Sequence, residues 1–121
     1  MNCLFCKIIN KDVPSKIVYE DDIVMVIMDI YPSVDGHVLV IPKKHYTDIF
    51  ELDDDTLLHI NKIAKDITNL LLKKLNETSM TWSVNYGDRQ EIKHYHLHLL
   101  PNYGKNKAKK DIEKIYELLK A

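Results

Sequence analysis

The longest periodic stretch of the chain predicts a helix over residues 53–75. Asp53, Asp54 and Asp55 stand at its start, where carboxylates can cap free amide groups and suit the positive end of the helix dipole. Its apolar residues recur at steps of three and four and so share one face: Leu57, Ile60, Ile63, Ala64, Ile67, Leu70, Leu71 and Leu75. Two shorter amphipathic segments, residues 5–10 and 111–120, predict a short N-terminal helix and a C-terminal helix.

Five other segments predict strands, because they are rich in β-branched residues or alternate between apolar and polar positions. The segments are residues 17–20, 23–30, 37–41, 80–85 and 94–100, with turn-forming residues between the first three. This order predicts an α+β fold, in which a five-stranded antiparallel sheet is covered on one face by the long helix. A chain of 121 residues is the length of one domain, so we expect a single domain over residues 1–121.

Composition and charge exclude several classes of protein. The 17 Lys and Arg and the 18 Asp and Glu leave a net charge of −1, too small to drive unspecific binding to nucleic acid or to an anionic membrane. The longest uninterrupted apolar run, residues 23–28, is far shorter than the roughly 20 residues that span a bilayer. The first residues show no secretory signal. We therefore expect a cytoplasmic protein with neither a nucleic-acid nor a membrane partner.

Both cysteines lie in the first six residues, as Cys3 and Cys6. A disulfide across this spacing would close almost no loop, and a CxxC pair in a reducing compartment more often binds a metal or does redox work. A thioredoxin-like use would need a strand before the pair, and only two residues precede Cys3. The spacing favours zinc, of which the pair would supply half of a tetrahedral site.

Three of the six histidines alternate with apolar residues along the last predicted strand. His94, His96 and His98 would share one face at a spacing of about 6.6–7 Å, with Tyr95, Leu97 and Leu99 on the other face. One zinc ion cannot easily bind all three, because the outer pair would lie about 13 Å apart. A neutral imidazole is also a competent nucleophile, and a protonated neighbour can hold phosphate oxygens. Catalysis at phosphorus is therefore the alternative to a three-histidine metal site.

The run over residues 94–100 resembles the His-φ-His-φ-His-φ-φ signature of the histidine triad (HIT) family of nucleotide hydrolases and transferases, in which φ is an apolar residue. Further segments resemble the family in order and spacing: residues 5–9, 13–17, 20–22, 28–32, 36–45 and Gln90. The resemblance covers about residues 3–101 and points to the bacterial-type, Hint-like members that carry a CxxC zinc site. It implies the HIT-like fold and a homodimer.

The resemblance also implies a reaction. The protein would cleave nucleoside 5′-phosphoramidates or related nucleotidyl substrates at the α-phosphate. His96 would attack and become nucleotidylated, after which water would release the nucleoside monophosphate. His98 would bind the phosphate oxygens, and His37 would stand beside the nucleophile. A purine nucleotide would be the substrate, with Asp29 accepting the ribose hydroxyls.

The remaining implied roles concern the nucleotide pocket and the metal. Asn85 would reach the phosphate, and Gln90 would be a further substrate-binding residue. The base would be enclosed by the apolar positions Phe5, Ile8, Val13, Ile27 and Ile30. One structural zinc per chain would be bound by a Cys2His2 set, in which His45 and His94 join Cys3 and Cys6. His59 lies on the polar side of the long helix and is assigned no role.

Two departures from the family pattern concern the leaving group. Asp88 and Arg89 replace the Gly-Gly or Ala-Gly pair of many members, and Glu91 stands where some phosphoramidase-type members place a serine that protonates the leaving group. Three alternatives therefore stay open on the sequence alone. They are a dinucleoside polyphosphate hydrolase, a nucleotide- and zinc-binding module with incidental turnover, and hydrolysis by a metal held on the triad.

Overall fold

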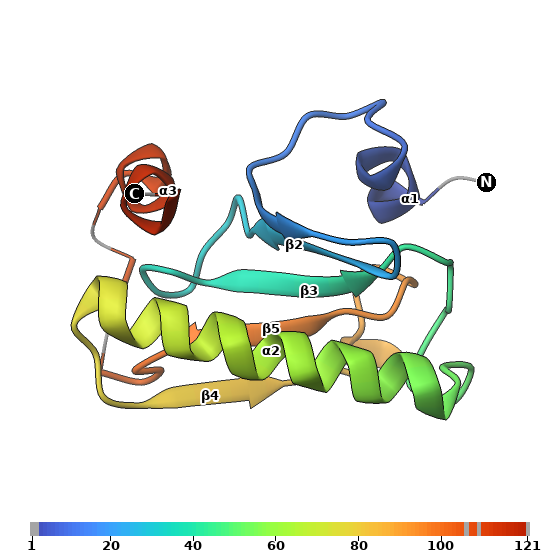
Figure 1. Ribbon diagram of the computed structural model, residues 1–121. Coiled ribbons are helices and arrows are strands. Elements are labelled where there is room, and N and C mark those ends of the chain that lie inside the picture. The colour runs from blue at the N-terminus through green and yellow to red at the C-terminus, as the bar shows by residue number, and fades with distance from the viewer. Residues whose placement is uncertain (1–2, 106, 109, 121) are drawn as a thin grey trace.

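The computed structural model describes residues 3–105, 107–108 and 110–120. Its elements are, in chain order, α1 (Leu4–Ile9), β1 (Ile17–Glu20), β2 (Val24–Met28), β3 (Val38–Pro42), α2 (Asp54–Leu75), β4 (Met80–Ser83), the 3-10 helix η1 (Gly87–Arg89), β5 (Leu97–Pro101) and α3 (Ile112–Lys120). The strands form one antiparallel sheet in the order β1-β2-β3-β5-β4, and α2 lies across one face of it (Figure 1). The predicted α+β fold is confirmed.

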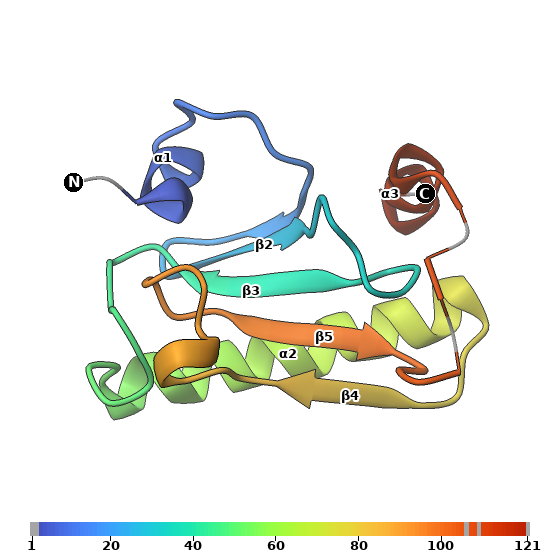
Figure 2. The ribbon, with the colours of Figure 1, turned by 180° about the vertical axis from the view of Figure 1, so that it is seen from behind.

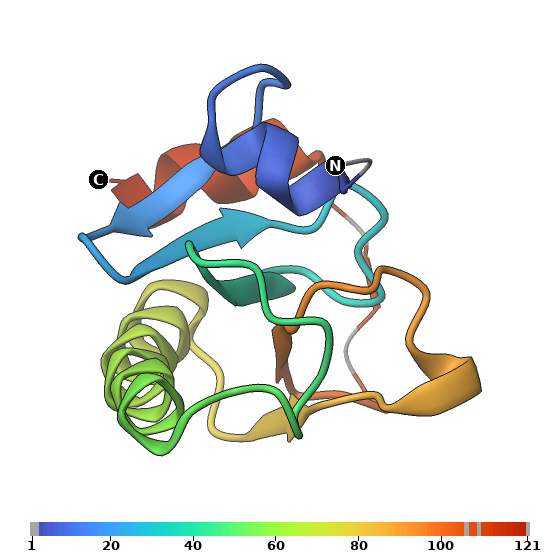
Figure 3. The ribbon, with the colours of Figure 1, turned by 90° about the vertical axis from the view of Figure 1, so that its right-hand side faces the viewer.

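The sheet separates two apolar cores, because side chains alternate between the two faces of a strand. The residues of β2 and β3 are all buried. On one face, Val26 and Val40 pack with α2 and α3, and on the other face Ile27 and Leu39 pack with α1. Figure 2 shows α1 and α3 at opposite ends of the sheet, and Figure 3 shows α1 and α2 on opposite sides of it.

The long helix begins and ends where its flanking residues can satisfy the backbone. Asp53 is the N-cap, and its carboxylate accepts a hydrogen bond from the amide of Thr56 at 3.3 Å. Asn76 ends the helix in the left-handed conformation, with φ of 56°. The predicted apolar stripe faces the sheet, with its central residues buried: Ile60, Ile63, Ala64, Ile67 and Leu71. Among the described residues, no helix is both long enough and apolar enough to cross a membrane.

The last strand is shorter than predicted and begins at Leu97 instead of residue 94. Its ladder with β3 ends at the pair of Val40 and Leu97, because Pro42 has no amide hydrogen with which to continue it. The carbonyl of Pro42 instead accepts a hydrogen bond from the ring of His94 at 2.8 Å. The alternation of faces continues through this lead-in segment, since Tyr95 still belongs to the core beneath α2.

The second strand is also shorter than the predicted residues 23–30, because an aspartate forms a turn at each end. The carboxylate of Asp21 accepts a hydrogen bond from the amide of Ile23, and that of Asp29 accepts one from the amide of Tyr31, both at 2.8 Å. Such bonds to an amide two residues on replace the ladder of a strand. The strands predicted at 37–41 and 80–85 run instead over Val38–Pro42 and Met80–Ser83.

The turn before β3 depends on Gly36, which has a φ of +85°. A Cβ atom there would overlap the side chain of Leu75 and lie 3.3 Å from Pro101 Cγ. We expect Gly36→Ala to lower the free energy of unfolding by about 2–5 kcal/mol, through backbone strain and overpacking together. Urea denaturation measures this difference.

Gly104→Ala is the matched control, because Gly104 has a φ of +94° but a methyl group added there would meet nothing within 4 Å. It isolates the backbone strain, for which we expect a loss of about 1–2 kcal/mol. Equal losses in the two variants would show that the contact with Leu75 adds nothing.

Candidate active site

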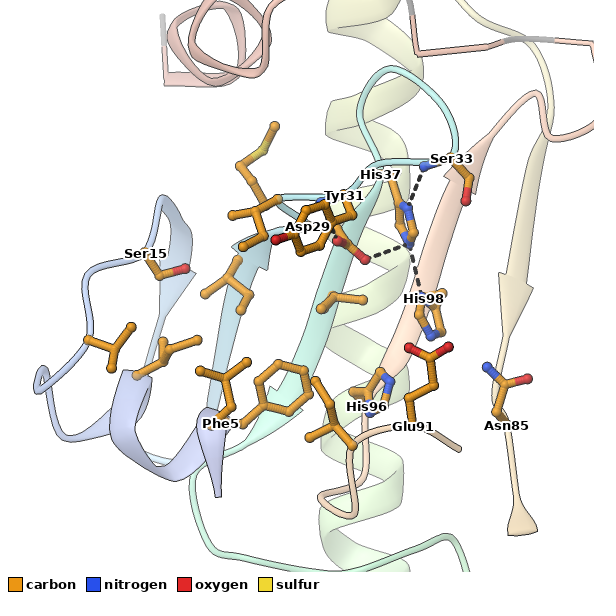
Figure 4. A pocket seen from close by; sticks show the side chains of 18 of the residues that line it. Phe5, Ser15, Asp29, Tyr31, Ser33, His37, Asn85, Glu91, His96 and His98 are labelled. Carbon is orange, nitrogen blue, oxygen red and sulfur yellow. Dashed lines mark hydrogen bonds and ion pairs between the residues drawn. The ribbon is translucent and has the colours of Figure 1, made fainter. Parts of the chain in front are cut away.

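A cavity of about 530 Å³ opens beside α1 and the segment between β2 and β3. Ten of the predicted site residues line it: Phe5, Ile8, Val13, Ile27, Asp29, Ile30, His37, Asn85, His96 and His98. Figure 4 shows Ser15 and Phe5 toward one end of the cavity and Asn85 toward the other, with His96, His98 and the Glu91 carboxylate side by side between them. The structure thus gathers three of the predicted histidines and the predicted nucleotide-binding side chains, except Gln90, around one space.

Hydrogen bonding fixes the tautomer of His96. Its Nδ1 lies 2.9 Å from the carbonyl oxygen of His94, which can only accept, so Nδ1 carries the proton. In the neutral ring the lone pair is therefore on Nε2. Burial lowers the pKa of His96, against the opposing effect of that hydrogen bond and of Asp29, so the ring is neutral at physiological pH. The edge of Phe5 packs on the ring, with centroids 5.1 Å apart.

A chain of hydrogen bonds fixes the opposite tautomer on His98. The amide of Ser33 donates to His37 Nδ1 at 3.1 Å, so the proton of His37 is on Nε2. His37 Nε2 donates in turn to His98 Nδ1 at 2.9 Å, which leaves the proton of His98 on Nε2 (Figure 4). Burial, with the neighbouring His96 and His37, lowers the pKa of His98 to about 4, so this ring is also neutral.

His98 Nε2 is the one buried side-chain nitrogen or oxygen for which the described residues offer no hydrogen-bond partner. A buried donor without an acceptor costs about 1–3 kcal/mol, and such groups often mark the position of a ligand. The tautomer of His98 makes this atom an N–H donor, which suits the anionic oxygen of a phosphate. The rings of His96 and His98 are 4.8 Å apart between centroids, so the lone pair and the donor belong to one site.

Asp29 lies just after β2 and beside His37. One of its oxygens accepts from the amide of Tyr31, and the other lies 3.5 Å from His37 Nε2. The pKa of His37 is lowered, mainly by burial. The charge of Asp29 opposes this effect, and the neighbouring His96 adds to it. The carboxylate of Asp29 lines the cavity with acceptor capacity that ribose hydroxyls could use.

The predicted metal ligands also converge. The donor atoms of Cys3, Cys6, His45 and His94 all lie within 4.8 Å of one another. The sulfur of Cys6 is 3.3 Å from His45 Nδ1 and 3.5 Å from His94 Nδ1, and the two Nδ1 atoms are 3.1 Å apart. Tetrahedral zinc with ordinary bond lengths places two nitrogen donors, or a nitrogen and a sulfur, about 3.3–3.6 Å apart.

The surroundings of this Cys2His2 group fit zinc as well. His94 donates from Nε2 to the carbonyl of Pro42 at 2.8 Å, so the lone pair of His94 lies on Nδ1, the atom nearest the thiols. The amide of Cys6 donates to the sulfur of Cys3 at 3.3 Å, which fixes the first turn of α1. Zinc bound here would connect α1 to the segments after β3 and before β5.

Gln90 is the one predicted substrate-binding residue that does not line the cavity. Its side chain is only 4% exposed and is absent from the cavity lining. Its amide nitrogen donates to the carbonyl oxygens of Thr47 and Ile92, at 2.6 Å and 3.0 Å. Gln90 therefore holds the segment between η1 and β5 against the loop after β3, and its predicted contact with substrate has no support in this geometry.

His59, which the sequence pattern places on the polar side of α2 without a role, has a partner in the turn between β1 and β2. Its Nε2 lies 2.8 Å from the carboxylate of Asp21. Burial by itself would raise the pKa of Asp21. Four hydrogen bonds to its carboxylate have a larger, opposite effect, so the pKa is lowered. The donors are the amides of Val24 and Ile23 and the side chains of His59 and Tyr19. No sequence pattern predicts this contact, because 38 residues separate the partners.

Comparisons with known proteins agree with this geometry. The family model described as the HIT domain matches residues 10–105. An HIT-like protein of Methanocaldococcus jannaschii is 44% identical over 103 residues, which are 84% of this chain and 79% of that protein. The adenosine 5′-monophosphoramidase of Saccharomyces cerevisiae is 33% identical over 99 residues, 82% of this chain and 61% of that enzyme.

A solved structure gives the same result. A zinc-bound histidine triad family protein of Mycobacterium smegmatis superposes with a TM-score of 0.90 at 32% identity, covering 98% of this chain and 91% of that one. With the family model matching most of the sequence and the fold shared over almost all of it, the chain belongs to the histidine triad family.

Proposed function

We propose that this protein hydrolyses purine nucleoside 5′-phosphoramidates through a nucleotidyl intermediate on His96. The observation that carries the proposal is the fixed pair of tautomers, a lone pair on His96 Nε2 and an N–H on His98 Nε2, at one cavity. The first can attack phosphorus and the second can stabilise the oxygens on which charge develops. The name of the yeast relative, adenosine 5′-monophosphoramidase, supports the choice of a P–N bond.

The reaction takes two steps. In the first, His96 Nε2 forms a bond to the α-phosphorus while the P–N bond breaks. The electron pair of that bond stays on the leaving nitrogen, which takes a proton from water. In the second step, water attacks phosphorus and releases one proton, and the electron pair of the N–P bond returns to His96 Nε2. The products are the free amine, the nucleoside monophosphate and the unmodified enzyme.

The cavity offers a place for each part of the nucleotide. Its apolar side chains from α1 and β2 suit the faces of a base, and Asp29 lies between them and the histidines, where a ribose would follow. A volume of about 530 Å³ is within the range of small-ligand pockets. Asn85 offers an amide on the other side of His98, toward the phosphate.

Zinc in the Cys2His2 group would supply structure and no reacting atom. Its ligand His94 lies two residues before the nucleophile, and Phe5, between the two cysteines, packs on the rings of both His94 and His96. The metal would therefore hold α1 and the lead-in to β5 at the distance that the cavity requires. Cysteine ligands stay reduced in the cytoplasm, which is the compartment we propose.

Hydrolysis by a metal held on the triad has less support. A metal needs a free lone pair on each ligand, but His96 Nδ1 carries a proton and His98 Nδ1 accepts the proton of His37. The lone pair of His94 lies among the thiols. These bonds leave only His96 Nε2 of the three rings with a lone pair for the cavity.

A homodimer remains part of the proposal. β4 is the outermost strand on its side of the sheet, and an unpaired edge gives a second copy of the chain a place to extend the sheet. Sedimentation equilibrium tests the mass, and a monomer at micromolar concentration would contradict this part alone.

A comparison of substrates tests the proposed reaction. We expect release of AMP from adenosine 5′-phosphoramidate with a kcat/KM at least about tenfold above that from diadenosine triphosphate, because Arg89 is the only lysine or arginine among the described residues of the cavity lining and a polyphosphate chain carries several negative charges. Chromatography of the products at steady state measures both rates. Faster cleavage of the dinucleotide would instead support a dinucleoside polyphosphate hydrolase. Micromolar binding of AMP without turnover of either compound would leave a nucleotide-binding module.

A further inference from the structure

The segment between η1 and β5 places a carboxylate in the cavity. Glu91 follows Gln90, whose buried amide ties the backbone to the carbonyls of Thr47 and Ile92. The side chain of Glu91 lines the cavity, and Figure 4 shows its carboxylate near His96 and His98. Its charge acts on the ring of His96. Glu91 is thus a charged side chain beside the reacting atoms that the two-step reaction does not use.

The layout of the cavity determines which part of a substrate would meet this carboxylate. In the proposed function, a nucleoside bound against Phe5 and Asp29 would lie on one side of the histidines, with its α-phosphate at His96 and His98. The leaving group would then extend away from the nucleoside, past the Glu91 carboxylate that Figure 4 shows beside the two histidines, and toward Asn85. Of these two side chains Asn85 is neutral, so only Glu91 would meet the leaving group with a charge.

We infer that Glu91 determines specificity for the leaving group, and that the site favours amines that carry a further positive charge over leaving groups that are anionic. The inference rests on the proposed function and names the substrate class within it. A carboxylate only accepts hydrogen bonds, so it can pair with the N–H of a phosphoramidate and attract an ammonium group. It repels a carboxylate or a second phosphate at the same place.

Arg89 lines the same cavity with the opposite charge, so its contribution must be separated from that of Glu91. Both side chains are exposed, and water screens their fields. We therefore expect a selectivity of about tenfold in the wild type rather than an absolute one.

Three adenosine 5′-phosphoramidates that differ only at the far end of the amine test the inference. They carry a 2-aminoethyl, a propyl or a 2-carboxyethyl group on the phosphoramidate nitrogen. We expect the wild type to cleave the aminoethyl compound with a kcat/KM about tenfold above that of the carboxyethyl compound. In Glu91→Gln this ratio falls to about two or less, and because it compares two substrates of one enzyme, a general loss of activity cancels.

Two further variants serve as controls. Glu117→Gln removes an exposed carboxylate of α3 that does not line the cavity, and should keep the wild-type ratio. A wild-type ratio near one, a ratio unchanged in Glu91→Gln, or a ratio lost in Arg89→Gln but kept in Glu91→Gln would each overturn the inference. If the wild type cleaves none of the three compounds, the proposed function itself fails.

Discussion

His96→Ala is expected to lower kcat for AMP release by about 10³-fold or more, because it removes the atom that forms the bond to phosphorus. The remaining groups, His98 and His37, can still orient a phosphate but have no lone pair in its direction: each ring nitrogen either carries a proton or accepts one. Mass spectrometry after quenching without acid should detect a nucleotidyl adduct on the wild type, located to the peptide of His96, and none on the variant.

His59→Ala is the matched control for this variant. It also replaces a histidine by alanine, but His59 lies on α2 and bonds Asp21, outside the cavity lining. We expect its kcat to stay within about twofold of the wild type. Circular dichroism should show the same secondary structure for all three proteins. Wild-type turnover by folded His96→Ala would falsify the assignment of the nucleophile.

The helices and strands of this fold can be predicted from the sequence more accurately than the residues at which they begin and end. The stripe on α2 was predictable, because eight apolar residues at helical spacing leave no other regular structure that buries them. The start of β5 was not predictable, because it depends on Pro42, in a different strand, which cannot continue the ladder. Alternation of His94 and Tyr95 looks like a strand, although their backbone lies before it.

The same contrast holds for the site. The histidines and Asp29 could be identified from the resemblance to the family. The tautomers could not, because they depend on backbone groups such as the amide of Ser33 and the carbonyl of His94, which leave no signal in the sequence. Gln90 was assigned to the substrate by its position before the triad, whereas in the structure its amide donates a hydrogen bond to the carbonyl of Thr47. Sequence names residue types, whereas tautomers and orientations come from neighbours that the fold supplies.

The two candidate sites are mechanically connected through α1. Cys3 caps this helix and Cys6 lies in its first turn, and Phe5 between them packs on His96. α1 has only six residues, too few to be stable as a helix by itself. Its position over the sheet therefore depends on the apolar core around Ile8 and on whatever holds the cysteines.

Removal of zinc is consequently expected to have the second largest effect. We expect the purified protein to contain one zinc per chain, measured by plasma emission, and a strong chelator to lower the melting temperature by about 10 °C or more. Four donors that lose their metal leave two thiols and two imidazoles crowded within 4.8 Å, and α1 loses its link to His45 and His94. Loss of AMP release should follow the displacement of Phe5 from His96, and added zinc should restore both melting temperature and turnover.

Cys6→Ala separates this structural role from a chemical one. The variant should contain less zinc, melt near the temperature of the chelated wild type, and show little further change when chelator is added. Ala108→Ser, a small substitution outside the cluster, should respond to chelator as the wild type does. If chelation abolished turnover at an unchanged melting temperature, the metal would act on the substrate. That result would favour metal-dependent hydrolysis over attack by His96, because a ligand cluster built only to hold α1 in place cannot lose its metal without loosening that helix.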